Sequence, residues 1–207
     1  MSFSRDPRIE TVPILSLRPT QITVGMREVS AKRRAWREHS GRKKARFLGS
    51  HLVPVIRGPA EHCYIIDHHH LALALHQEGV QDVAITVVAD LRALARGAFW
   101  VYLDNRGWLH PYDDAGHRRG HEDVPKRITQ LRDDPFRSLA GELRVVGGFA
   151  KDTTPFSEFL WADFLRRRIR RRLVKQDFDR ALELAVGLAK SAAAAYLPGW
   201  CGPTSRG

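Results

Sequence analysis

The stretch that decides the fold runs from residue 63 to residue 88 and reads CYIIDHHHLALALHQEGVQDVAITVV. It opens with a β-branched and aromatic run, continues with alternating Leu and Ala, and closes with a second β-branched run. Ala and Leu favour helix and Gly79 is a typical stop, whereas Val and Ile favour strands. The stretch therefore predicts a strand, a helix that begins near His68 and a second strand, in the order of a βαβ unit.

The residues on either side extend this pattern into two unlike halves. The run Val53–Ile56 and the turn at 58–61 predict a hairpin with the first strand of the stretch. Residues 9–15 predict an edge strand, because Pro13 cannot donate to a ladder. Beyond Asp90 the sequence is mostly helix-compatible. We therefore expect an α/β (α+β) protein with a small mixed sheet, followed by a mainly helical C-terminal half.

The predicted sheet defines a domain at residues 1–90, and the helices form an extension at 91–207 packed on it. Helices are expected to start near Gly25, Val124-Pro125 and Asp134-Pro135. Another start at Thr154-Pro155 predicts a long helix to about Lys175. A last helix is expected from Asp177 to Tyr196.

Composition narrows the classes of protein. The 207 residues carry a formal charge of +11, a sequence pI of about 10.3 and 43% hydrophobic residues. No apolar run reaches the length of a membrane span, and Met1–Pro7 lacks a signal-peptide pattern. The two distant cysteines, with Cys63 in an apolar run, fit a reducing compartment. We expect a soluble cytoplasmic protein with no membrane partner and an unknown oligomeric state.

The positive charge favours polyanionic partners, although a highly basic proteome would produce it with no partner at all. It is concentrated in two segments. Residues 27–46 hold nine basic and two acidic residues, a net charge of +7. Residues 166–172 hold six arginines, while Leu165, Ile169 and Leu173 form an apolar stripe at helical spacing. These arginines form either a solvated face or a nucleic-acid contact made by Arg166, Arg167, Arg170 and Arg171.

The candidate chemical site is Asp67-His68-His69-His70, at the expected strand-to-helix junction. A helix N-terminus attracts phosphate, and histidines in its first turn donate hydrogen bonds or move protons near neutral pH. His69 is expected to be exposed there and to contact the phosphate. Asp67 either caps the helix, or orients a histidine or holds Mg²⁺ beside the phosphate.

A zinc site is not expected, despite ten histidines. Neighbouring histidines on a helix point about 100° apart, so three in a row cannot share one ion. His117 and His121 have i, i+4 spacing but lack the glutamate of the metalloprotease helix.

Several blocks, in order along residues 10–175, resemble the ParB-like nuclease family. These are Leu17-Arg18-Pro19-Thr20-Gln21, Val24-Gly25-Met26-Arg27-Glu28-Val29 with Lys32, Ile66-Asp67-His68-His69-His70, Asp133-Asp134-Pro135-Phe136-Arg137-Ser138-Leu139, Gly147-Gly148-Phe149 and residues 155–164. The resemblance implies the fold of the wider ParB/sulfiredoxin superfamily, whose members include DNA-partition CTPases, sulfiredoxins and free-serine kinases.

That superfamily shares a helix-opening phosphate motif of the type Asp-Gly-His-x-Arg. By resemblance, Asp67 and His69 match its aspartate and histidine, whereas His68 replaces the glycine and Leu71 replaces the arginine. Losing the arginine removes a bidentate phosphate ligand. The resemblance further implies catalytic roles for Asp67, His69 and Glu28. It implies phosphate or nucleotide contacts from Gly25, Arg27, Lys32, His68 and His70.

Two functions remain open. The first is phosphoryl chemistry on a nucleotide or phosphodiester, by a nuclease or a kinase-like enzyme, with Mg²⁺ and a nucleotide as cofactors. The second is non-catalytic binding of DNA or nucleotide with a vestigial site. The missing arginine favours the binding protein, whereas the three histidines favour the enzyme.

Overall fold

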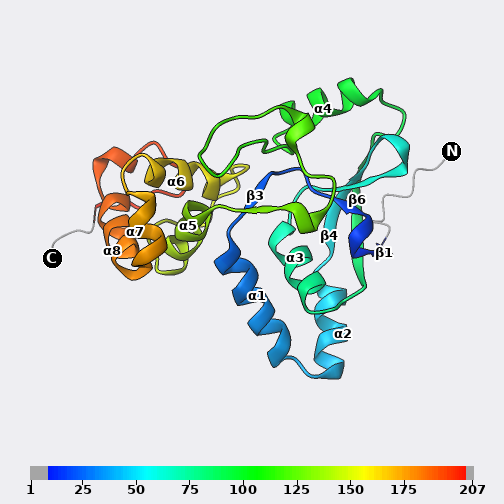
Figure 1. Ribbon diagram of the computed structural model, residues 1–207, viewed down its shortest axis with the longest axis horizontal. Helices are drawn as coiled ribbons and strands as arrows, with labels where there is room; N and C mark the ends of the chain where they lie inside the picture. Colours follow the sequence, from blue (N-terminus) through cyan, green and yellow to red (C-terminus); the bar gives the residue numbers. More distant parts are fainter. Residues whose placement is uncertain (1–8, 204–207) are drawn as a thin grey trace. The chain divides into compact units, whose positions relative to one another are not determined.

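The computed structural model describes residues 9–203, so the interpretation of Met1–Pro7 lies outside the described residues. The strands are β1 (Ile9–Pro13), β2 (Leu17–Arg18), β3 (Thr23–Val24), β4 (Val53–Arg57), β5 (Cys63–Ile65), β6 (Asp82–Asp90) and β7 (Arg132–Asp133). The helices are α1 (Met26–Glu38), α2 (Gly41–Ser50), α3 (His69–Gln77), α4 (Arg96–Asn105), α5 (Pro135–Val145), α6 (Ser157–Arg166), α7 (Arg171–Gln176) and α8 (Phe178–Ala189) (Figure 1). The predicted α/β class, with helices dominating after residue 90, is confirmed.

The described chain divides into two compact units. The first contains the residues up to Ile22 together with Val29–Pro111 and Arg119–Leu131. The second contains Thr23–Glu28, Tyr112–Arg118 and the residues from Arg132 onward. Neither unit begins or ends at residue 90, where the sequence predicted a domain boundary. Helix α4, which follows residue 90, packs into the unit that holds the main sheet.

The first unit is built on a mixed five-stranded sheet in the order β1-β6-β4-β5-β2. The β4–β5 hairpin and the edge position of β1 agree with the sequence. The expected βαβ unit is wrong. β4 lies between β5 and β6, parallel to β6 and antiparallel to β5, so the strands on either side of α3 run in opposite directions. Strand direction depends on pairing across the sheet, which local propensity does not contain.

Helix α3 lies almost wholly inside the first unit. Its residues 71–75, all Leu or Ala, are at most 3% exposed. The helix ends at Gln77, just before the predicted stop Gly79, whose φ of 79° is left-handed, and the N–H of Val80 donates to the carbonyl of Leu75. This is a common way to close a helix C-terminus. Burial of α3 places the turn that precedes it against the sheet.

The second unit has a helical core made by α5, α6, α7 and α8. The long helix predicted to Lys175 is wrong, because α6 ends at Arg166 and α7 begins at Arg171. Arg170 between them is extended, with ψ of 130°. The break lets Ile169 enter the core at 4% exposure from a link rather than from a helix.

Two other helix predictions are also corrected. The helix expected at Val124-Pro125 is replaced by two 3-10 turns, His121–Asp123 and Ile128–Gln130. The last helix is shorter than expected, since α8 ends at Ala189. In both places the apolar residues are buried by irregular backbone, which helical spacing cannot reveal. No helix among residues 9–203 is long and apolar enough to cross a membrane.

Candidate functional site

The Asp67–His70 turn joins β5 to α3 with its backbone in an uncommon conformation. His68, the N-cap of α3, has a φ of 65° and lies in the left-handed region. Glycine adopts this region without steric cost, and His68 stands at the position that resembles the glycine of the superfamily motif. The Asp67 side chain is 76% exposed, and its Oδ1 accepts a hydrogen bond of 2.6 Å from the N–H of His68. His68 Nε2 lies 4.0 Å from Asp67 Oδ2. The turn thus presents a carboxylate beside an imidazole.

His69, in contrast, points into the first unit and is 3% exposed. Its Nε2 accepts a hydrogen bond of 3.2 Å from the N–H of Thr20, and the ring also bonds the backbone of Ile65. Burial, with the neighbouring histidines, lowers the pKa of His69 to about 3. The expected exposure of His69 is therefore wrong, because the side chain is buried and its Nε2 already accepts the hydrogen bond from Thr20. Its role in catalysis stays a prediction.

The position of the missing motif arginine is also internal. Leu71 is 3% exposed and belongs to the buried face of α3, so this position supplies packing. His70 is half-buried. Within residues 9–203 no group of three or more His, Cys, Asp or Glu side chains could hold a metal ion. Mg²⁺ can be bound by a single carboxylate when a phosphate supplies other ligands, and Asp67 offers one carboxylate. Binding of Mg²⁺ at Asp67 stays a prediction.

Glu28, the predicted base, lies in the second unit in the first turn of α1. Its Oε1 accepts a hydrogen bond of 2.6 Å from Arg137, which is 6% exposed. A methyl group on Gly141 would come within 1.9 Å of the same oxygen, so glycine there leaves room for the pair. Glu158 lies 4.0 Å from Arg137. Glu28 is thus a partner of a buried cation, and its catalytic role stays a prediction.

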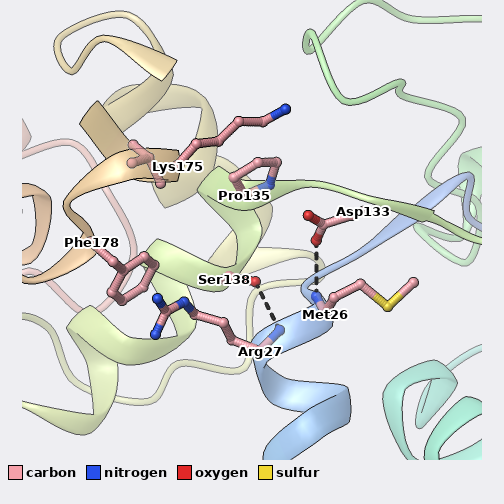
Figure 2. A pocket seen from close by; sticks show the side chains of 8 residues that line it. Met26, Arg27, Asp133, Pro135, Ser138, Lys175 and Phe178 are labelled. Atoms are coloured by element: carbon pink, nitrogen blue, oxygen red, sulfur yellow. Dashed lines mark hydrogen bonds between the residues drawn. The ribbon is translucent and has the colours of Figure 1, made fainter. Parts of the chain in front are cut away.

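The beginning of α1 packs on the beginning of α5 through Gly25. A methyl group on Gly25 would lie 2.9 Å from both N and Oγ of Ser138, closer than side-chain carbons approach backbone. With glycine there, Asp133 Oδ1 accepts the N–H of Met26 at 3.1 Å, and Ser138 Oγ accepts the N–H of Arg27 at 3.3 Å (Figure 2). The first amides of α1 are thus already capped. Glycine at position 25 allows α1 and α5 to pack closely. The phosphate contact expected of Gly25 stays a prediction.

A pocket of about 200 Å³, called here the α1–α5 pocket, opens beside these contacts within the second unit. It is lined by Met26, Arg27, Asp133, Pro135, Ser138, Val174, Lys175 and Phe178. The Arg27 guanidinium lies 3.5 Å from the centre of the Phe178 ring (Figure 2). Among the described residues, neither Arg27 nor Lys175 has a carboxylate partner. The pocket therefore carries two unpaired positive charges and the carboxylate of Asp133.

The arginines of residues 166–172 are mostly engaged by the protein itself. Arg166 is 15% exposed and bonds Asp134, which is 1% exposed. Arg167 pairs with Asp163, Arg168 lies over Phe164, Arg171 pairs with Asp114, and Arg172 bonds Gln176. Four of the six arginines are exposed, whereas Arg166 and Arg171 are half-buried. The Arg170 side chain is exposed and has no ion-pair or hydrogen-bond partner among the described residues. The nucleic-acid contacts expected of this segment stay a prediction.

The basic residues of α1 and α2 differ from that segment. Arg33 and Arg37 are held by Glu78, and Lys44 lies 5.0 Å from the Trp36 ring. Five exposed side chains have no ion-pair partner among the described residues. These five, the α1–α2 cations, are Lys32, Arg34, Arg42, Lys43 and Arg46. The helices α1 and α2 (Figure 1) therefore carry a group of five exposed cations without ion-pair partners among the described residues.

Comparison with known proteins identifies the family. A family model described as "Putative ParB-like nuclease" matches residues 10–167, about three quarters of the chain. The chain belongs to the ParB-like nuclease family. Protein Atu1540 from Agrobacterium tumefaciens, known from its crystal structure, is similar to this ParB-like protein. The two are 52% identical with a TM-score of 0.88, over 95% of this chain and 99% of that chain. No curated protein matches.

The sequence indicated only part of the pocket in this ParB-like protein. Among the lining residues, Arg27 was singled out as a site residue by family resemblance, and the helix start at Asp134-Pro135 pointed to the facing element. Lys175 and Phe178 were missed. They come from helices that no local pattern links to α1, so only tertiary packing brings them to the pocket.

Proposed function

We propose that this ParB-like protein binds the phosphate backbone of nucleic acid through the α1–α2 cations. The observation that carries the proposal is the contrast in pairing between the two basic segments. Three of the six arginines in the 166–172 segment pair with neighbouring carboxylates, whereas the α1–α2 cations are exposed and unpaired. Phosphate contacts from such side chains release counterions and carry no sequence readout. The binding is therefore independent of base sequence and sensitive to salt.

The test is the anisotropy of two labelled DNA duplexes of unrelated sequence, measured between 50 and 200 mM salt. Affinity should fall steeply with salt and be equal for the two duplexes. If Arg42, Lys43 and Arg46 are replaced together by glutamine, the slope of log K against log salt should become less steep. The change should correspond to the loss of about three phosphate contacts. The matched control replaces the exposed Arg167, Arg170 and Arg172 by glutamine. Equal weakening in both triple variants would remove α2 as the binding element.

A second candidate is Mg²⁺-assisted cleavage of a phosphodiester at the Asp67–His70 turn. The exposed Asp67 carboxylate, with the His68 ring nearby, supports it. Such a carboxylate could hold the ion while the ion neutralises charge on the phosphate. Cleavage of labelled DNA that needs Mg²⁺ and is lost in Asp67→Asn, but kept in the exposed control Asp82→Asn, would establish it. Intact DNA after incubation of wild-type protein with Mg²⁺ would exclude it.

A further inference from the structure

We propose that a cavity beside the first turn of α4 binds the carboxylate group of an organic acid or of a peptide chain end. This cavity, called here the Arg18–Arg96 cavity, is lined by residues of β2, β5 and α4 and of the segment 121–126. All of these belong to the first unit. The lining includes neither the Asp67–His70 turn, nor Arg27, nor the α1–α2 cations. The inference therefore goes beyond the proposed function and does not depend on it.

Two arginines from separate elements lie near one buried hydroxyl group at this cavity. Arg18 ends β2, and Arg96 is the first residue of α4. Arg18 donates a hydrogen bond to the hydroxyl of Tyr64, a residue that is 6% exposed. Burial raises the pKa of Tyr64, whereas the positive charges of Arg18 and Arg96 act to lower it. A charge shifts a pKa only from nearby, so both guanidinium groups lie close to the same hydroxyl oxygen.

The cations around this hydroxyl have no carboxylate partner in the protein. Arg18, Arg96 and Lys126 line the cavity, and none of them forms an ion pair within residues 9–203. Arg18 is half-buried, where an unpaired charge is costly. Glu122 also contributes to the lining, but its side chain is 70% exposed and its Oε2 lies 3.5 Å from His121 Nδ1. Three cations against one carboxylate repel one another, and a bound anion would offset that repulsion.

The volume of the cavity favours a carboxylate over a phosphate. It measures about 20 Å³. One water-sized atom needs about 10–15 Å³ on this scale, so the cavity holds one to two oxygen atoms. The two oxygens of a carboxylate match this space, whereas the four oxygens of a phosphate exceed it. A carboxylate also presents the flat pair of oxygens that the edge of a guanidinium group binds, and the remainder of the ligand stays outside.

The test is a titration of the isotope-labelled full chain, followed in nitrogen–proton NMR correlation spectra. The reporters are the assigned indole N–H signal of Trp100, which lines the cavity, and the backbone amide signal of Arg96. The probes are sodium acetate, sodium chloride and inorganic phosphate at equal ionic strength. We expect acetate to shift both signals until they saturate. Chloride and phosphate should need higher concentrations, because a single atom cannot contact both arginines and a phosphate is too large.

Substitutions at the two ends of α4 separate a specific contact from general charge. Arg96→Gln removes one charge-assisted hydrogen bond and should weaken acetate binding about tenfold. Arg106→Gln is the matched control, because Arg106 is exposed, lies over the Trp108 ring at the other end of α4 and does not line the cavity. It should leave the affinity unchanged. Glu122→Gln removes the negative charge of the lining and should raise the affinity for acetate.

A triglycine peptide and its C-terminal amide distinguish the two sources of the carboxylate. Tighter binding of the peptide than of acetate, with no response to the amide, assigns the cavity to a chain end. Tighter binding of acetate assigns it to a small organic acid. The proposal is overturned if neither acetate nor the peptide gives a saturable shift in the millimolar range, or if chloride acts equally. Equal weakening by Arg96→Gln and Arg106→Gln would overturn it as well.

Discussion

The backbone N–H of Thr20 donates a hydrogen bond to Nε2 of His69 across 3.2 Å, and both residues are buried. Thr20 also uses its side chain, donating from Oγ1 to the carbonyl of Ile65 at 2.7 Å. The histidine that resembles a phosphate ligand is thereby part of the link between the first turn of α3, β5 and the segment after β2. This relationship makes His69 a determinant of stability.

We expect His69→Ala to lower the free energy of unfolding by about 2–4 kcal/mol, from a cavity and an unsatisfied Thr20 amide. Urea unfolding followed by circular dichroism measures this. The half-buried His76 near the end of α3 offers a control, and His76→Ala should have a much smaller effect. A fully stable His69→Ala protein would contradict the hydrogen bond.

The depressed pKa of His69 also predicts a pH dependence. In the unfolded chain the imidazole binds a proton below about pH 6.5, whereas in the folded protein its pKa is about 3. Between these two pH values the unfolded state binds more protons than the folded state. The contribution of His69 to the free energy of unfolding is therefore fully present above pH 6.5 and falls as the pH decreases toward 3. The slope contributed by this group is at most about 1.4 kcal/mol per pH unit. Urea unfolding at several pH values should show this pH dependence of the free energy of unfolding in wild-type protein. A folded His69→Gln variant should lack the part that His69 contributes.

Arg166 and Arg167 should respond differently to the same substitution. Arg166→Gln leaves the buried Asp134 without its cation and should cost about 3–5 kcal/mol. Burial already raises the pKa of Asp134, and loss of Arg166 should raise it further. Arg167→Gln removes an exposed pair with Asp163 and should cost at most about 1 kcal/mol. Thermal unfolding compares the two, and equal losses would argue against the buried pair.

Glu28→Gln distinguishes a structural partner from a catalytic base. Removing this charge weakens the bond to the buried Arg137, so we expect stability to fall by about 1–3 kcal/mol. The exposed Glu38 on the same helix has no ion-pair partner among the described residues, and Glu38→Gln should be neutral. Denaturant unfolding of both variants gives the difference. Unchanged stability in Glu28→Gln, together with lost turnover, would instead favour the role of base.

Local sequence by itself determined the element types in residues 63–88, the stop of α3 at Gly79 and the concentration of charge on α1 and α2. These features follow from propensity and composition, which act within a few residues. The family resemblance likewise placed Arg27 and Glu28 in a region of interest.

Tertiary structure decided which side chains are available for chemistry. His69 is turned inward by an amide 49 positions away in sequence, and Arg166 is neutralised by a carboxylate 32 positions away. Strand order separated β5 from β6, and packing of α1 and α7 on α5 assembled the pocket. Burial and ion pairing depend on groups that the fold brings together, so periodicity along the chain predicts a helix but not which of its polar side chains remains free.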